Sequence, residues 1–389
     1  MRHSRPIGRP WGLTTGACTV VAAAWLVGIT SVGVGAHKAK TSPFSYNADI
    51  FPILRDNCGT CHVEGGPAPM SLMTYDTDGG AVAWAESIRE MLLSGAMPPW
   101  YADPAGPAVR NNHRLTAREL DKVITWATGG TPHGDLALKL PKVVVRHGWA
   151  RGEPDATLPA PEPFTVAAHV MQASHEVTIP THFTQARWVR AADLLPGSAA
   201  MVRRAYISVE GGPMLAVWEP GSDPVDAPHD TAFQVPANAS LHLKIDYKKG
   251  WQDEQSALED KSVVGLYFAQ PPSGGKSIQS VTIHGTPSSN QFTGAVPMAG
   301  RVVALRPMLD NAYATVDITA IDRSGKTVSL LKLRNPRPEW PRRYWLEKPI
   351  PVPAGSTVTV KTTAGDPDIG PLGKVEAFPL QIDLDVVPD

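Results

Sequence analysis

Cysteine is scarce in this chain: Cys18, Cys58 and Cys61 are the only three in 389 residues. A scaffold built on many disulfides is therefore excluded, and the domains must be stabilised by packing. Charge of one sign is also lacking, since 36 Lys and Arg stand against 37 Asp and Glu and the formal net charge is −1. No basic patch stands out, so nucleic acid is not an expected partner.

Proline and glycine, by contrast, are abundant, with 38 and 34 residues. This composition favours many turns and short strands over a helical bundle. The length of the chain predicts two to four domains, each able to bury a core of its own.

The N-terminus has the pattern of an export signal. Arg2, Arg5 and Arg9 precede an uncharged run over 10–36 that ends in the small residues Val34-Gly35-Ala36. This order predicts a cleaved signal peptide over 1–36 and a periplasmic or otherwise exported protein. The alternative is an uncleaved anchor, because the run is just long enough to span a bilayer. Only in that case do we expect membrane association.

The strongest motif is Cys58-Gly59-Thr60-Cys61-His62, the attachment signature of c-type haem. Two thiols on one turn can each add across a vinyl group of the same porphyrin, and His62 can then ligate the iron on its proximal side. The alternative is a redox or zinc site of the CxxC type that happens to precede a histidine. Export favours haem, and we expect one covalent haem c.

Residues 41–135 predict a small all-α domain around this motif. Short helices are expected over 47–55 and 81–93, and a third is expected to open with a capping box of Thr116 and Glu119. A second axial ligand is expected, and Met97, on a stiff Pro-Pro loop, is favoured over Met70. The alternative is that these methionines only fill the core.

Several short motifs of this region occur together in one known module. They are Pro52-Ile53-Leu54, the Cys58–His62 motif, Ala68-Pro69-Met70, Met97-Pro98-Pro99-Trp100, Leu115-Thr116, Trp126-Ala127 and Gly129-Gly130-x-Pro132-x-Gly134. The set resembles the cytochrome c module that precedes a copper monooxygenase-like region in some exported bacterial proteins. The resemblance covers about residues 44–135.

A proline-rich linker is expected over 136–164, and alternating apolar runs follow it. The expected strands are 176–179, 186–192, 202–209, 240–247 and 263–268 in a first group. A second group comprises 279–283, 301–305, 314–321, 327–333, 357–362 and 380–387. The spacing predicts two antiparallel β-sandwiches, over 165–275 and 276–389.

These two domains are similar to the type II copper, ascorbate-dependent monooxygenases, the family of peptidylglycine hydroxylating enzymes and dopamine β-monooxygenase. The matching motifs are Trp188-Val189-x-Ala191 before Pro196-Gly197, Gly265-Leu266-x-Phe268-Ala269, and Pro349-Ile350-x-Val352-Pro353-Ala354-Gly355-Ser356. The resemblance implies tandem jelly-roll-like sandwiches and, in the family, two copper sites.

The ligand positions of the family differ here. Arg203-Arg204 stands where the resemblance implies a His-His pair, Asp246 replaces a histidine, and Pro307-Met308-Leu309-Asp310 replaces a Pro-His-Met-His segment. Guanidinium groups have no lone pair to offer a metal. We therefore expect that this region does not hold copper, and that Arg203, Arg204 and Asp246 form a structural ion pair or line an anion pocket instead.

Other residues could rebuild a metal site of a different kind. His169, His175 and His182 precede the first sandwich, and His242 shares a strand face with Asp246. Met308 and Asp310 would share a face if their segment is a strand. Solvated histidines are the alternative.

Three functions remain open from the sequence. The first is an electron-carrying mono-haem cytochrome whose β region docks an unknown redox partner protein. The second is a haem-fed copper monooxygenase that hydroxylates a small organic substrate. The third is a non-redox binding protein that the haem domain anchors or gates.

Overall fold

The structure is a computed structural model that describes residues 41–285, 290–365 and 380–389. The predicted signal peptide lies outside the described residues. Residues Thr41–Asp389 form one compact unit. Within the described ranges, no helix is both long and apolar enough to cross a membrane.

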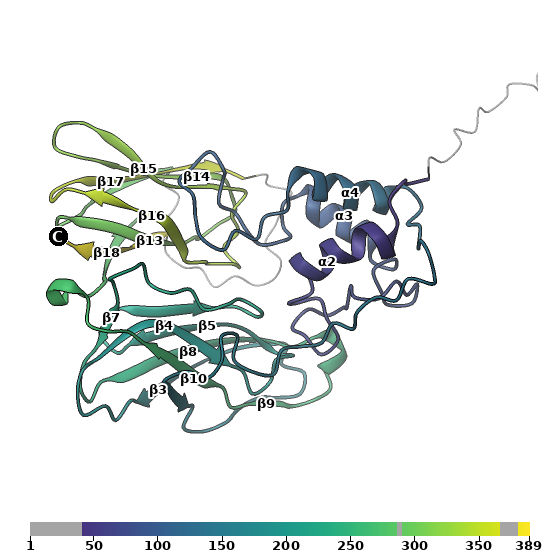
Figure 1. Ribbon diagram of the computed structural model, residues 1–389, viewed down its shortest axis with the longest axis horizontal. Helices are drawn as coiled ribbons and strands as arrows, with labels where there is room; N and C mark the ends of the chain where they lie inside the picture. The colour runs from purple at the N-terminus through teal and green to yellow at the C-terminus, as the bar shows by residue number, and fades with distance from the viewer. Residues whose placement is uncertain (1–40, 286–289, 366–379) are drawn as a thin grey trace, which may run out of the picture. The chain divides into compact units, whose positions relative to one another are not determined.

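The N-terminal part of this unit is helical (Figure 1). A π-helical turn over Tyr46–Ile50 runs into α2 (Phe51–Asn57), and α3 (Ala85–Leu93) and α4 (Ala117–Thr128) follow. Tyr46 and Trp126 are fully buried in the core that these helices share. The predicted capping box is confirmed, since Thr116 and Glu119 each accept a hydrogen bond from the other's backbone N–H.

The predicted start of the second helix was wrong by four residues. Residues 81–84 form turns, in which the amides of Ala83 and Ala85 donate to the carbonyls of Gly80 and Val82, three residues earlier. Helix α3 therefore begins only at Ala85.

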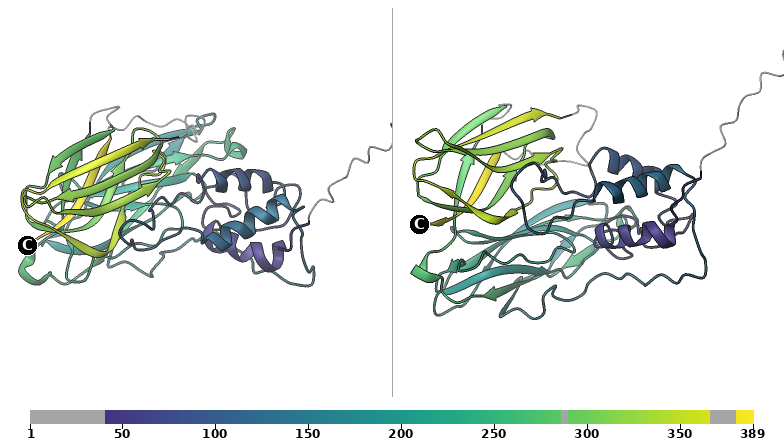
Figure 2. Two further views of the ribbon diagram at one scale, coloured as in Figure 1. Left: turned by 90° about the horizontal axis from the view of Figure 1, so that it is seen from above. Right: turned by 45° about the horizontal axis from the view of Figure 1, so that its top comes forward.

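Two groups of antiparallel sheets follow, which confirms the predicted β-sandwich class (Figure 2). One sheet of the first group has the order β1-β10-β4-β7 and the other β3-β8-β5-β6, with a small β2-β9 pair beside them. The strands are β1 (Ala156–Pro159), β2 (Phe164–Val166), β3 (Gln172–Pro180), β4 (Arg187–Leu195), β5 (Val202–Val209), β6 (Met214–Trp218), β7 (Phe233–Val235), β8 (Ser240–Lys248), β9 (Leu258–Asp260) and β10 (Val263–Phe268).

The second group has sheets of order β11-β18-β13-β16 and β12-β17-β14-β15. Its strands are β11 (Gln279–His284), β12 (Gln291–Ala295), β13 (Gly300–Met308), β14 (Tyr313–Ile321), β15 (Thr327–Arg334), β16 (Tyr344–Val352), β17 (Thr357–Ala364) and β18 (Gln381–Pro388). In each group the inward residues of both sheets, mainly Val, Leu and Ile, form one apolar core.

The stretch predicted as a linker contributes to the first sandwich. Residues 156–159 form β1, which pairs with β10 from Ala156 opposite Leu266 to Pro159 opposite Val263. A proline is compatible with this position because β1 is the edge strand of its sheet.

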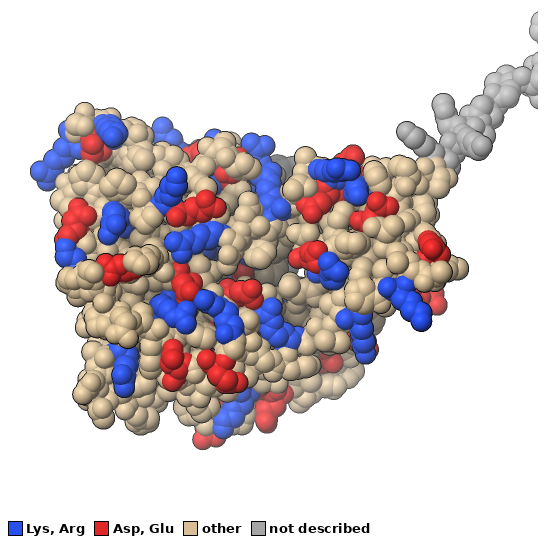
Figure 3. Space-filling view, viewed as in Figure 1, with Lys and Arg blue, Asp and Glu red and all other residues tan. Residues whose placement is uncertain are grey.

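The segment after the Met-Pro-Pro-Trp motif is tied to the second sandwich. Ala102 bridges to Leu333 of β15, and Val109 bridges to Leu346 of β16. On the face shown in Figure 3, lysine and arginine are interspersed with aspartate and glutamate.

Candidate functional site

The Cys58–His62 segment forms a tight turn at the end of α2. Cys58 is the C-cap residue of that helix, and its carbonyl accepts hydrogen bonds from the amides of Cys61 (3.1 Å) and His62 (2.8 Å). The amide of Gly59 donates to Leu54 at 2.8 Å. The backbone of the turn therefore holds the two thiols and the imidazole together on one loop.

The chemistry of these three side chains suits a ligand set. Both thiols are free and half-buried. Burial raises the pKa of Cys58 to about 12 and also raises the pKa of Cys61, while burial lowers the pKa of His62. The imidazole is therefore neutral near pH 7, which is the form that binds metals.

The imidazole of His62 also has a nitrogen without a partner. Its Nδ1 is buried and makes no hydrogen bond to the part of the chain that the structure describes. The backbone of Met70 opposes the effect of burial on the pKa of His62 by hydrogen bonding to the ring. One nitrogen of the His62 ring is thus available to a metal. The backbone of Met70 can orient the ring through a hydrogen bond.

The candidate distal ligands lie at different places. Met97 follows α3, and its amide donates to the carbonyl of Met91 at 3.2 Å. Met73 is buried, with its sulfur 3.0 Å from the point where a Cβ on Gly59 would lie. Among the described residues no backbone hydrogen bond joins Met97 to His62, and the role of Met97 as a ligand stays a prediction.

One side of the turn packs against the first sandwich. The Cys61 thiol lies 3.8 Å from the carbonyl oxygen of Pro220, in the loop after β6. At Gly221, whose φ is +70°, a Cβ would lie 2.2 Å from the Cβ of Thr60, so only glycine allows this approach. Gln252 donates to the carbonyl of Pro69 at 2.7 Å.

A cavity of about 200 Å³ opens beside this contact. It is lined by residues of the turn, of the stretch 143–150 and of the first sandwich, including Gly59, Val63, Val144, Leu194 and Trp218. The lining is largely apolar, and we assign no ligand to it.

Of the positions that correspond to copper ligands in the resembled family, two form an ion pair. Arg204 on β5 contacts Asp246 on β8 at 2.9 Å, and both side chains are mostly buried. Ser174 donates to the other oxygen of Asp246 at 3.0 Å. The structure thus shows the predicted Arg–carboxylate pair for Arg204, whereas Arg203 has another environment.

The second-domain positions do not join this pair. Met308 is the last residue of β13, and its sulfur accepts a hydrogen bond from Gln381 at 3.6 Å. Asp310 follows the strand and accepts a hydrogen bond from the Tyr313 hydroxyl at 2.7 Å. The condition under which Met308 and Asp310 would share a strand face is not met, because β13 ends at Met308.

The histidines considered for a rebuilt site are separated. His242 lies 3.3 Å from Glu176, and His175 stacks on Phe164 with a centroid distance of 4.3 Å. His169 and His182 both have positive φ values, and His169 lies in a turn. In the described ranges, no group of three or more His, Cys, Asp or Glu could hold a metal ion.

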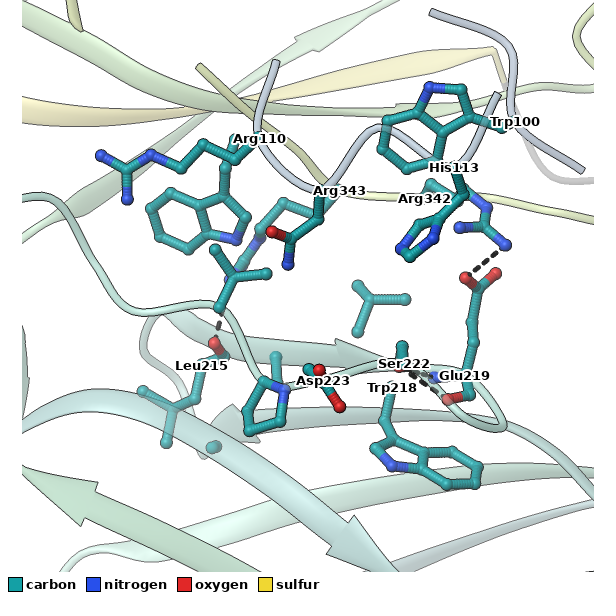
Figure 4. Close-up of a pocket in the computed structure, with 17 residues that line it drawn as sticks. Trp100, Arg110, His113, Leu215, Trp218, Glu219, Ser222, Asp223, Arg342 and Arg343 are labelled. Carbon is teal, nitrogen blue, oxygen red and sulfur yellow. Dashed lines mark hydrogen bonds and ion pairs between the residues drawn. The ribbon is translucent and has the colours of Figure 1, made fainter. Parts of the chain in front are cut away.

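A polar cluster that the sequence did not predict lies where three segments meet (Figure 4). Arg342 pairs with Glu219 at 2.9 Å and lies over the ring of Trp100, and His113 contacts the same ring edge-on at 5.6 Å. The cluster lines a cavity of about 80 Å³. The three segments are more than 100 residues apart, so no local pattern could have indicated it.

Comparison with known proteins identifies no family. No family model and no curated protein matches the chain. Among solved structures, the A223 turret protein of Sulfolobus turreted icosahedral virus is 10% identical with a TM-score of 0.18, covering 60% of this chain and 99% of that one. A Paenibacillus xanthan lyase is 11% identical with a TM-score of 0.19, covering 62% of this chain and 26% of the lyase. Likeness at this level does not bear on fold or function.

Proposed function

We propose that this chain is an exported c-type cytochrome that holds one covalent haem and transfers single electrons. Cys58 and Cys61 would form the two thioether bonds, and His62 would be the proximal ligand. The observation that carries the proposal is the buried Nδ1 of His62, which lacks a partner among the described residues, on the same turn as two free thiols. A ligand at this imidazole would give a partner to a buried polar atom that otherwise has none.

Met97 is our choice for the distal ligand, ahead of Met70. The backbone of Met70 lies beside the imidazole of His62, which is the proximal side. Met70 would therefore serve to orient the His62 ring through its backbone, which is a different role from that of a second ligand. Met97 lies in a separate loop after α3 and has no such restriction.

When bound, the haem would supply one-electron chemistry between ferric and ferrous iron. The chain's own contribution is to hold and bury this group. Cys58 and Met70 pack against the helical core that includes Phe51, Leu72 and Trp126. Such an apolar surrounding restricts solvent access, and in this way it influences the potential.

We propose that the β-sandwiches act as a docking module for a redox partner protein rather than as a copper enzyme. Arg203 and Arg204 have no lone pairs with which to bind copper. Both oxygens of Asp246 are engaged, by Arg204 and by Ser174. A copper ion at this place would have to break a mostly buried ion pair.

Haem analysis of the exported protein tests this proposal. After expression in a host that attaches c-type haem, haem should stay with the polypeptide through denaturing extraction. The double variant Cys58→Ala/Cys61→Ala should lose covalent haem, and His62→Ala should lose the low-spin spectrum. The control His284→Ala, at an exposed site on β11, should match the wild type in both respects. A wild-type polypeptide without covalent haem would contradict the proposal.

A further inference from the structure

Arg203 lies at an irregularity of β5 that separates it from its neighbour. In the pairing of β5 with β8, Val202 lies opposite Tyr247 and Arg204 opposite Asp246, so Arg203 is the extra residue of a β-bulge. Bulges redirect one side chain out of the regular alternation and are common beside functional sites. Arg204 faces the carboxylate of Asp246, and the bulge allows the side chain of Arg203 to point in a different direction.

The pairing of β5 with β6 brings the start of β5 toward the loop that contacts the Cys58–His62 turn. Ala205 lies opposite Trp218, which is the last residue of β6, and Pro220 follows two residues later. The carbonyl of Pro220 is the group that contacts the Cys61 thiol at 3.8 Å. Arg203 and Cys61 accordingly influence one another's pKa through their charges.

The positive charge of Arg203 has no close counter-charge. Its guanidinium donates to the carbonyl of Ala200 at 3.0 Å, and no carboxylate of the described residues lies within ion-pair distance. Asp253 acts on it only from farther away. Burial lowers the pKa of Arg203 to about 10, which leaves the group charged at neutral pH. By contrast, the neighbouring Arg204 has Asp246 at 2.9 Å.

We infer that Arg203 is a positioning residue of the first sandwich that raises the reduction potential of the haem. The inference rests on the proposed function, because it requires a haem joined to Cys61. Reduction is a one-electron step in which ferric iron takes an electron from an external one-electron donor, and no bond forms or breaks. The haem gains one negative charge in this step, and a half-buried cation nearby favours the product.

This inference gives the β region a part in setting the properties of the haem. The contacts at Pro220 and Gly221 bring the first sandwich against the turn, Gln252 donates to Pro69 farther along the chain, and Arg203 adds a fixed charge to this part of the sandwich. A cation at this place is inert to titration at neutral pH. Its effect on the potential should therefore be constant over the pH range in which the protein works.

Potentiometric titration of the full-length holoprotein, followed by its absorption spectrum, tests the inference. Arg203→Gln should shift the midpoint potential downward, and Arg203→Lys should keep it at the wild-type value. The matched control is Arg187→Gln, which removes the same charge from an exposed site on β4 of the same sandwich and should leave the potential unchanged. An unchanged potential in Arg203→Gln with the haem retained would overturn the inference, even if the stability of the variant fell.

Two further measurements separate the possible failures. If Arg203→Gln does not fold, Asp253→Asn decides, since loss of the carboxylate that acts on Arg203 from farther away should raise the potential, and an unchanged value would contradict the inference. If the wild-type chain holds no covalent haem, the proposed function itself fails, and this is seen before any variant is compared.

Discussion

Met97 is proposed as the distal haem ligand because of the chemistry of its thioether, and not because of a contact that the structure shows. A thioether ligand gives a low-spin haem with a raised potential. Met97→Ala should therefore produce a high-spin spectrum and allow carbon monoxide to bind the reduced protein. The matched variant Met70→Ala should keep the low-spin spectrum, and a loss of that spectrum in Met70→Ala alone would transfer the distal role to Met70.

The ion pair of Arg204 and Asp246 leads to a prediction about the stability of single-residue variants. Their side chains are 14% and 20% exposed, so removal of either partner leaves a mostly buried charge unpaired. Arg204→Ala and Asp246→Ala should each lower the free energy of unfolding by about 3 kcal/mol. Arg204→Met combined with Asp246→Leu should be far less harmful than the sum of two single losses.

Urea unfolding of the holoprotein measures these effects. Ser174→Ala, which removes only a hydrogen bond to Asp246, is the control and should cost about 1 kcal/mol. If both single variants were as stable as the wild type, the ion pair would not contribute to holding β5 against β8.

At the scale of the elements, the capping box of α4 is a local sequence motif whose contribution to stability can be tested. Thr116 accepts a hydrogen bond from the amide of Glu119, and the Glu119 carboxylate accepts one from the amide of Thr116. Thr116→Ala should lower the free energy of unfolding by about 1 kcal/mol, and Thr116→Ser should restore it. Equal stability of all three proteins in urea unfolding would show that the cap makes no net contribution.

The elements also show which parts of the fold the sequence could predict. Strand β8, whose burial alternates regularly, ends one residue later than predicted, and the bounds of β5 and β10 agree with prediction to the residue. Strand β16 was not among the predicted strands, because Pro349 and Pro351 interrupt its pattern. Those prolines are tolerated since β16 is the edge strand of its sheet, which is a property of the assembled sheet and not of the local sequence.

The candidate site also has a part that the sequence could predict and a part that it could not. Cys58, Cys61 and His62 lie within five consecutive residues, so their proximity follows from the sequence alone. The contact of Cys61 with Pro220 joins residues 159 positions apart and depends on how β6 ends. The bulge that separates Arg203 from Arg204 likewise depends on the pairing of two distant strands, so the sequence could not distinguish their roles.

At the scale of the whole chain, each flank of the proposed haem site is joined to a different sandwich. The Cys58–His62 turn contacts the first sandwich at Pro220 and Gly221. The segment after Met97 contacts the second, where Asp103 pairs with Arg334 at 3.0 Å. Both sandwiches are therefore in contact with the N-terminal part of the chain, the first through the turn and the second through the segment after Met97.

Haem and copper measured together in the same purified, exported protein test the central claim most directly. The protein should be purified from cells supplied with both iron and copper, and its covalent haem, iron and copper should be compared with the amount of polypeptide. We predict one covalent haem for each chain and no stoichiometric copper. A chain without covalent haem, or one that holds about two copper ions in the manner of the resembled monooxygenases, would contradict this account.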